Sequence, residues 1–170
     1  TVEVLYLLGE EARIAGISGF TTHPPRARKE KPKVSGFSSA KIERILAVEP
    51  DLVLAFSDLQ GDIARDLVKA GVAVHVFNHR SVDGILAMIE TVGRLVGADA
   101  RALALVAELE QTIATERAAG EARAARLGGR PKVYFEEWNE PLITGIRWVS
   151  ELIGIAGGDD CFGELSVHPN

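Results

Sequence analysis

Apolar residues in the first half of the chain follow two alternating spacings. Three runs of strand length, residues 13–18, 51–56 and 72–77, are rich in apolar residues and predict buried β-strands. Between them, apolar residues recur at helical spacing over residues 39–49 and 63–70, which predicts two helices. Strands that alternate with helices in this order are typical of a parallel sheet, so we predict an α/β fold.

Local signals set the ends of these elements. Residues 4–8 are predicted to form a short helix that ends at Gly9, and the proline-rich stretch 19–32 is predicted to be an irregular loop. Ser39 is the expected N-cap of the helix that follows, with Glu43 at roughly the spacing of a capping box. The helix should therefore begin directly after Ser39.

A long helix is predicted in the second half of the chain. Residues 82–96 form one amphipathic helix, and a break at residues 97–99 separates it from residues 100–127, which are dense in strong helix formers and contain no proline. At 1.5 Å per residue the second helix would span about 40 Å, more than the width of a small sheet layer. We therefore expect it to connect two bodies, the alternative being a long helix packed along one domain.

The remaining residues begin another α/β pattern. Residues 132–138 are predicted to form a strand and residues 148–155 a helix, after which no further strand is predicted. One strand and one helix do not make a domain. The predicted organisation is a first α/β lobe over residues 1–80, a helical connector over residues 81–130, and the beginning of a second α/β lobe over residues 131–170.

Composition narrows the functional classes. The net charge is −5, which argues against a nucleic-acid partner because phosphate binding needs clustered Lys and Arg. The basic run over residues 26–33 is interpreted as a solvated loop. The single cysteine, Cys161, excludes an internal disulfide. No apolar run reaches the roughly 18 residues of a membrane span, so no direct membrane insertion is expected, and the first residues lack the pattern of a signal peptide.

The order of several short motifs resembles a known family. A helix leads into a Pro-Asp-Leu-Val step, a Gly-Val pair precedes the third strand, and an aromatic and acidic strand precedes spaced glycines and a tryptophan. The residues are Lys33–Ile45, Glu49–Ala55, Gly71, Val72, Phe135–Trp138, Gly145, Trp148, Gly157 and Gly158. Over essentially all of its length the chain resembles the class III (helical-backbone) periplasmic binding proteins of ABC importers, and it is most similar to their cobalamin-binding branch.

This resemblance implies a fold and a function. The family has two α/β lobes joined by one rigid helix, and it binds its small-molecule ligand in the cleft between them. It implies a periplasmic or cell-surface protein that captures a corrinoid, such as cobalamin, and delivers it to an ABC transporter permease. A ferric siderophore or haem is the alternative ligand. An enzyme that uses the cleft and a cytosolic corrinoid carrier are the alternative functions.

The chain also departs from the family pattern. Members of the family open with a strand ahead of the first helix and continue through most of a second lobe. We therefore expect this chain to be truncated at both ends, with a first lobe that lacks its first strand.

Candidate ligand-binding residues follow the strands of the first lobe. In open α/β sheets, ligands bind at the carboxyl ends of the strands, and Phe20, Phe37 and Phe56 lie at such ends or in adjoining loops. By resemblance these three match aromatic residues that flank the ligand, and flat rings suit an apolar macrocycle. Ser57 and Asp58 follow the second strand and are candidate hydrogen-bonding residues. The alternative for each phenylalanine is an ordinary core residue.

Further candidates lie in the loops. Trp138 and Trp148 would face the cleft by resemblance, although Trp148 could instead fix its helix against the core. Asn139 and Gly145, between them, are candidate hydrogen-bonding positions. His23, in the proline-rich loop, is a candidate ligand for the metal of a bound corrinoid or haem.

Glu43 has a separate candidate role. It lies one turn into its predicted helix, away from the apolar face. By resemblance it matches the glutamate of the first lobe that docks on an arginine pocket of the permease. A single charge at such an interface mainly sets orientation and encounter rate. The alternative is a solvated carboxylate.

Catalytic chemistry is not predicted. His75 lies within a predicted strand and His79 beyond it, so they are not expected to form a metal pair. Glu136 and Glu137 are adjacent in a predicted strand and point to opposite faces, so they cannot act together as an acid–base pair. No phosphate-binding loop, nucleophile elbow or Cys/His dyad is visible. We expect a binding protein with no catalytic residues, no bound metal and no resident cofactor.

Overall fold

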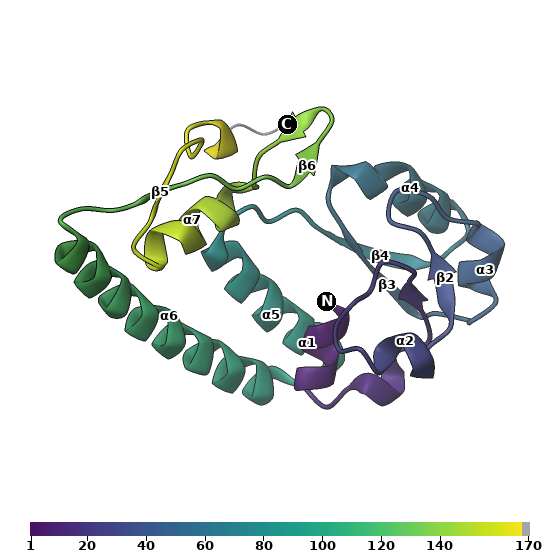
Figure 1. Ribbon diagram of the computed structural model, residues 1–170. Helices are drawn as coiled ribbons and strands as arrows, with labels where there is room; N and C mark the ends of the chain where they lie inside the picture. Colours follow the sequence, from purple (N-terminus) through teal and green to yellow (C-terminus); the bar gives the residue numbers. More distant parts are fainter. Residues whose placement is uncertain (168–170) are drawn as a thin grey trace. The chain divides into compact units, whose positions relative to one another are not determined.

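The computed structural model describes residues 1–167 and confirms the α/β class (Figure 1). Helices alternate with short strands, and within the described residues three of the four two-stranded sheets are parallel. The chain folds as two compact units. The first unit contains Thr1–His79 and Met88–Ala102, and the second contains Arg80–Ala87 and the chain from Leu103 onward. The predicted lobe boundaries at residues 80 and 130 stay a prediction.

The first unit contains the chain's first two sheets. Its elements up to β4 are α1 (Val2–Leu7), η1 (Glu11–Arg13), β1 (Ile17–Ser18), α2 (Ala27–Glu30), β2 (Lys33–Ser35), α3 (Ile42–Leu46), β3 (Leu52–Phe56), η2 (Asp58–Gln60), α4 (Gly61–Lys69) and β4 (Ala73–Phe77). Strands β3 and β4 pair in parallel over their whole length, from Leu52 opposite Ala73 to Phe56 opposite Phe77. Helix α4 connects them, as the alternating pattern predicts.

The strands β1 and β3 each have one edge that pairs with no other strand in the described part of the chain. On the paired side of β1, the N–H groups of Ile17 and Gly19 donate to the carbonyl oxygens of Pro32 and Ser35 at 2.9 and 2.8 Å. Because successive N–H groups along a strand point to opposite sides, the intervening Ser18 N–H faces the open edge. The open edges of β1 and β3 both border the cavity described below.

Part of the core of the first unit lies between α1, β1 and α2. Tyr6, Ile14, Ile17 and Ala27 form a buried cluster there. Burial of each large apolar side chain contributes about 1.5–3 kcal/mol. The hydroxyl of Tyr6 reaches the rim of the cluster and donates to the Glu30 carboxylate at 2.8 Å, so its one polar atom is satisfied.

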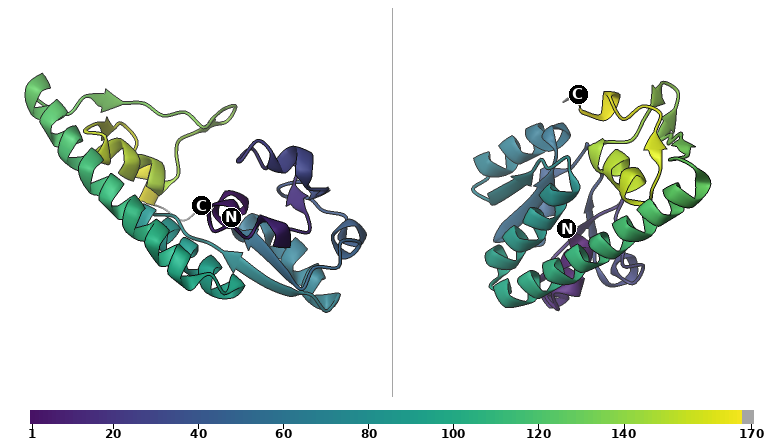
Figure 2. Two further views of the ribbon diagram at one scale, coloured as in Figure 1. Left: turned by 90° about the horizontal axis from the view of Figure 1, so that it is seen from below. Right: turned by 90° about the vertical axis from the view of Figure 1, so that its left-hand side faces the viewer.

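The two longest helices have residues in both units. Helix α5 (Val82–Val96) begins in the second unit and continues in the first, and α6 (Asp99–Leu127) begins in the first and continues in the second. Figure 2 shows α6 as one uninterrupted helix, as its composition predicts. The second unit then adds β5 (Lys132–Val133), β6 (Trp138–Asn139), β7 (Leu142–Ile143), α7 (Arg147–Ile155), β8 (Asp159–Asp160) and η3 (Leu165–Val167).

In the second unit, α6 packs against the end of α7 through glycine. A Cβ atom on Gly120 would lie 2.2 Å from the carbonyl oxygen of Ile155 and 2.7 Å from the nitrogen of Gly157. Gly157 has a φ of +90°, a conformation that favours glycine. The helix backbone therefore touches the turn after α7 directly.

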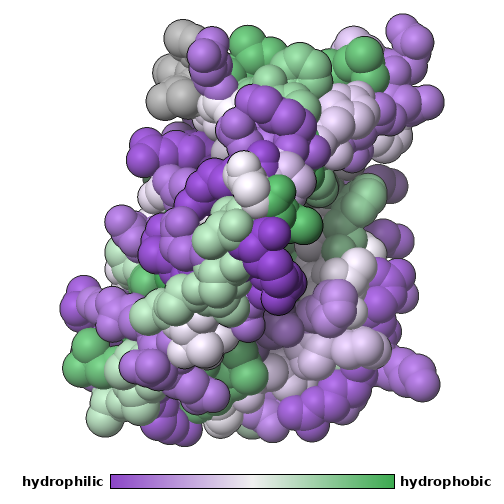
Figure 3. Space-filling model, turned by 60° about the vertical axis from the view of Figure 1, so that its left-hand side comes forward, coloured by the Kyte–Doolittle hydropathy of each residue, from purple (hydrophilic) through white to green (hydrophobic). Residues whose placement is uncertain are grey.

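The molecular surface mixes residue types. On the face drawn in Figure 3, hydrophilic residues, in purple, lie between groups of hydrophobic ones, in green.

Three boundaries predicted near the N-terminus are wrong. The proline-rich loop contains the short helix α2, because Ala27 and the charged residues after it are good helix formers and the prolines lie outside them, Pro24 and Pro25 before and Pro32 after. Helix α3 begins at Ile42 with Lys41 as its N-cap. The carbonyl of Ser39 instead accepts the N–H of Gly36 at 2.8 Å, so Ser39 belongs to the preceding turn. In addition, residues 11–13 form the 3-10 helix η1 where the first strand was predicted to start.

Strand predictions in the second unit also differ from the structure. The predicted strand 132–138 is split into β5 and β6, which residues 134–137 separate. The prediction that no strand follows α7 is wrong, because β8 pairs in parallel with β5, Lys132 opposite Asp159 and Val133 opposite Asp160. Two adjacent aspartates lack the apolar character by which strands are predicted. They join the sheet through their backbone, and the Lys132 ammonium lies 2.6 Å from the Asp159 carboxylate.

Candidate functional site

A cavity of about 570 Å³ lies within the first unit. Its walls include the edge residues of β1 and the whole of β3, so it runs along the two open strand edges. Four of the predicted ligand-binding residues line it together, namely Phe20, His23, Phe37 and Phe56. The sequence therefore predicted a group of residues that the fold does bring to one place.

The three phenylalanines are not sealed inside the core. Phe20 is 71% exposed and Phe37 is 38% exposed, while Phe56 is partly buried at the end of β3. Exposed rings beside a cavity leave apolar area in contact with water, and a flat apolar ligand would cover it. This arrangement fits a binding wall better than a packed core.

Ser57 and Asp58 do not line the cavity. Ser57 is 2% exposed and has φ 70° and ψ 159°, a backbone conformation that residues other than glycine rarely adopt. Its N–H donates to the carbonyl oxygen of Phe77 at 2.7 Å, and its Oγ accepts the N–H of Leu59 at 3.1 Å. The hydroxyl thus begins η2, on which Asp58 is exposed.

Gln60, the last residue of η2, also lines the cavity and was not predicted. Its Oε1 accepts the N–H of Phe56 at 2.8 Å, and its Nε2 donates to the carbonyl oxygen of Phe37 at 2.6 Å. One amide therefore connects the backbones of two candidate aromatic residues. No sequence signal marks it, because the contact joins positions 23 residues apart.

Histidines lie in two different settings. His23 is exposed at the cavity, and its Nδ1 is 3.0 Å from the hydroxyl of Thr22, which leaves Nε2 as the nitrogen that could reach a metal. His75 and His79 instead lie against Phe77 and Phe56, with ring centroids 4.3 and 5.0 Å apart respectively. Across residues 1–167, no three His, Cys, Asp or Glu side chains gather closely enough to hold a metal ion.

The candidates of the second unit lie around a hairpin and the helix that follows it. Trp138 and Asn139 form the exposed strand β6, and the indole Nε1 of Trp138 donates to the carbonyl oxygen of Glu140 at 3.0 Å. Gly145 is buried where a Cβ atom would lie 2.8 Å from Val149. Trp148 is half-buried in the first turn of α7.

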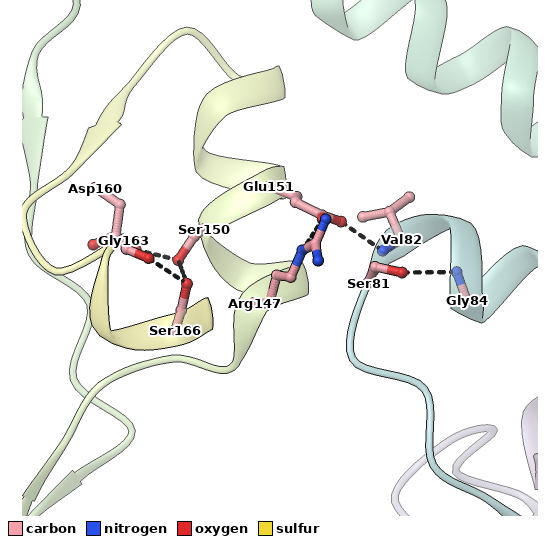
Figure 4. A network of polar contacts seen from close by, with 9 residues as sticks. All are labelled: Ser81, Val82, Gly84, Arg147, Ser150, Glu151, Asp160, Gly163 and Ser166. Carbon is pink, nitrogen blue, oxygen red and sulfur yellow. Dashed lines mark hydrogen bonds and ion pairs between the residues drawn. The ribbon is translucent and has the colours of Figure 1, made fainter. Parts of the chain in front are cut away.

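Helix α7 carries two polar networks on opposite sides (Figure 4). On one side the hydroxyl of Ser150 contacts the Asp160 carboxylate and lies 3.1 Å from the hydroxyl of Ser166. On the other side Glu151 accepts the N–H of Val82 at 2.7 Å and the Nε of Arg147 at the same distance. Glu151 therefore caps the first turn of α5, whose N–H groups have no partner within the helix. No pattern in the sequence predicts that Glu151 caps this helix, because Glu151 and Val82 are 69 positions apart.

Glu43 is exposed in the first turn of α3. A carboxylate at the start of a helix is favoured by the helix dipole, which accounts for its place without any partner. Its exposure also leaves it accessible to another protein.

Comparisons with known proteins decide the family. The sequence profile of the periplasmic binding proteins matches residues 1–168. The chain belongs to the periplasmic binding protein family. A cobalamin-binding protein of Halobacterium salinarum is 29% identical over 168 residues, which are 97% of this chain and 44% of that protein. The chain spans about half the length of the curated relatives it matches.

Solved structures of the family have the same fold. The periplasmic vitamin B12-binding protein of Vibrio cholerae has a TM-score of 0.78 at 22% identity, over 99% of this chain and 64% of that one. A periplasmic haem-binding protein from Roseiflexus has a TM-score of 0.79 at 23% identity, over 98% and 64%. Among residues 1–167, no helix is long and apolar enough to cross a membrane.

Proposed function

We propose that this chain captures a corrinoid of the cobalamin type for an ABC importer, as a binding protein and not as an enzyme. The observation that carries the proposal is the cavity with Phe20, Phe37 and Phe56 on its wall. Family membership and the cobalamin-binding relative support it. A corrin ring is broad and largely apolar, so stacking on flat side chains would bury much area at a low cost in conformational entropy.

The proposed location is the periplasm or the cell surface, and the proposed protein partner is an ABC transporter permease. Glu43 is the proposed contact, because its exposed carboxylate could meet a basic pocket. Replacing it by arginine should leave ligand affinity unchanged and weaken docking to the cognate permease. A loss of ligand affinity in Glu43→Arg would remove the docking role.

The direct test of the ligand is a fluorescence titration of the 170-residue chain. Cyanocobalamin and dicyanocobinamide absorb where tryptophan emits, so binding should quench Trp138 and Trp148 at about micromolar ligand or below. Phe37→Ala and Phe56→Ala should each weaken binding about tenfold through lost stacking. Phe162→Ala, a partly exposed phenylalanine outside this cavity, is the matched control and should bind like the wild type. Absence of quenching by either corrinoid would refute the proposal.

Haem is the second candidate, and His23 is the observation that favours it. Its imidazole lies at the cavity and could ligate iron through Nε2. Titration with haemin would then shift the Soret band, and His23→Ala would abolish the shift. A ferric siderophore added in the same titration tests the remaining alternative.

A further inference from the structure

Gln60 stands between the two best-placed rings of the cavity wall. Its side-chain amide uses both of its functional groups: Oε1 accepts from the Phe56 N–H at 2.8 Å, and Nε2 donates to the Phe37 carbonyl at 2.6 Å. The first distance lies within the ordinary range of N–H···O hydrogen bonds, and the second is slightly shorter than that range. Gln60 itself is half-buried and lines the cavity.

The Phe56 N–H needs a partner of this kind. The neighbouring N–H, that of Ser57, donates to the carbonyl oxygen of Phe77, the last residue of β4, at 2.7 Å. Since successive N–H groups of a strand point to opposite sides, the Phe56 N–H points to the open edge of β3, where no described strand pairs with it. The Gln60 amide takes the place of a neighbouring strand at this one position.

The Phe37 side of the contact is a turn. Gly36 donates to the carbonyl of Ser39 at 2.8 Å, and Ser35 forms an isolated antiparallel bridge with Ala40, so the turn is closed on itself. The bond from Gln60 attaches this closed turn to the end of β3. Because each ring is carried by its own backbone, the amide fixes the spacing of the Phe37 and Phe56 rings.

We infer that Gln60 is a positioning residue that sets the separation of the two aromatic rings for the ligand, an inference that rests on the proposed function. A glutamine is suited to this role because it offers one donor and one acceptor on a planar group. Glutamate keeps an acceptor for the Phe56 N–H. Its second oxygen also only accepts, so it cannot replace the donor that Gln60 offers to the Phe37 carbonyl. Methionine has a similar length but offers neither a hydrogen-bond donor nor a strong acceptor.

The two variants separate the two halves of the contact. Amide hydrogen exchange, followed by NMR on the labelled chain, should show the Phe56 N–H exchanging about tenfold faster in Gln60→Met, because it loses its acceptor. The Ser57 N–H, bonded to Phe77, should keep its rate and serves as the internal control. In Gln60→Glu the Phe56 N–H should remain protected. Gln111→Met, at the other glutamine of the chain, should change neither rate.

Ligand affinity completes the test. Both Gln60 variants should bind cyanocobalamin about tenfold more weakly than the wild type, whereas Gln111→Met should bind equally well. An unchanged Phe56 exchange rate in Gln60→Met, or affinities within about twofold of the wild type in both variants, overturns the inference. If the wild-type chain binds no corrinoid, the proposed function fails, and the positioning role fails with it, even where exchange data support the contact.

Discussion

Gly120 gives the sharpest test of how α6 is attached to the second unit. An alanine there would place its Cβ 2.2 Å from the Ile155 carbonyl oxygen and 2.7 Å from the Gly157 nitrogen, where ordinary contacts are at least 3 Å. The obstructing atoms are backbone, so they cannot move aside as a flexible side chain would. Overpacking of this kind costs about 1–3 kcal/mol, and the better helix propensity of alanine offsets about 1 kcal/mol of it. We expect Gly120→Ala to lower the free energy of unfolding by up to about 2 kcal/mol.

Gly154 supplies the matched control. It is also a helical glycine of the second unit, but a Cβ atom there would have no heavy atom within 4 Å. Gly154→Ala should therefore stabilise the unit by up to about 1 kcal/mol through helix propensity alone.

The assay is urea unfolding followed by tryptophan fluorescence, because Trp138 and Trp148 both report on the second unit. The two alanine variants should shift the transition in opposite directions. Equal or greater stability of Gly120→Ala would show that the packing of α6 against the turn after α7 is wrong.

Three further predictions follow from polar groups. Burial raises the pKa of the Tyr6 phenol above 10, so folding stability should decline as the pH rises above about 10, and Tyr6→Phe should flatten that decline in pH-dependent thermal melts. Glu151→Ala should lower the free energy of unfolding by about 1 kcal/mol in the same urea assay by removing the acceptor of the Val82 N–H, and Ser81→Ala, which removes the Oγ that accepts the Gly84 N–H at 3.1 Å, should cost a similar amount. Ser57→Gly should be more stable than Ser57→Ala by about 1–3 kcal/mol, because glycine relieves the φ of 70° while both variants lose the hydroxyl; equal stabilities would refute the strain.

Elements whose residues face the core in a regular pattern were predictable. Helix α5 and strands β3 and β4 follow from their apolar residues, because burial on one or both faces fixes the spacing, and α6 follows from its density of strong helix formers. Strand β8 was not predictable, since its two aspartates join a sheet through backbone groups that any residue possesses. Helix α3 began later than predicted because Ser39 was taken into the preceding turn.

The residues of the candidate site also include some whose position could be predicted from the sequence and others whose position could not. That Phe20, Phe37 and Phe56 contact a ligand stays a prediction, and what the structure shows is that they line one cavity. Phe56 ends a strand that can be read from the sequence, whereas the strand before Phe37, Lys33–Ser35, was not predicted. Gln60 and Glu151 were missed because their roles depend on backbone groups brought near by the fold, which leave no pattern along the chain. Ser57 was predicted as a ligand contact, yet its hydroxyl starts the 3-10 helix after β3. A serine directly after a strand is also typical of the N-cap of a following helix, which is the role that Ser57 has in the structure.

The open edges of β1 and β3 bear on how the protein behaves during purification. A strand edge without a neighbouring strand offers backbone donors and acceptors to any extended chain, and β3, Leu52–Phe56, carries no charged side chain to discourage such pairing. Gln60 occupies this edge at the Phe56 N–H alone. Two copies of this chain should therefore associate by pairing their exposed strand edges as the protein concentration rises. Purification in dilute solution, with light scattering as the monitor, is the condition under which the monomer can be studied.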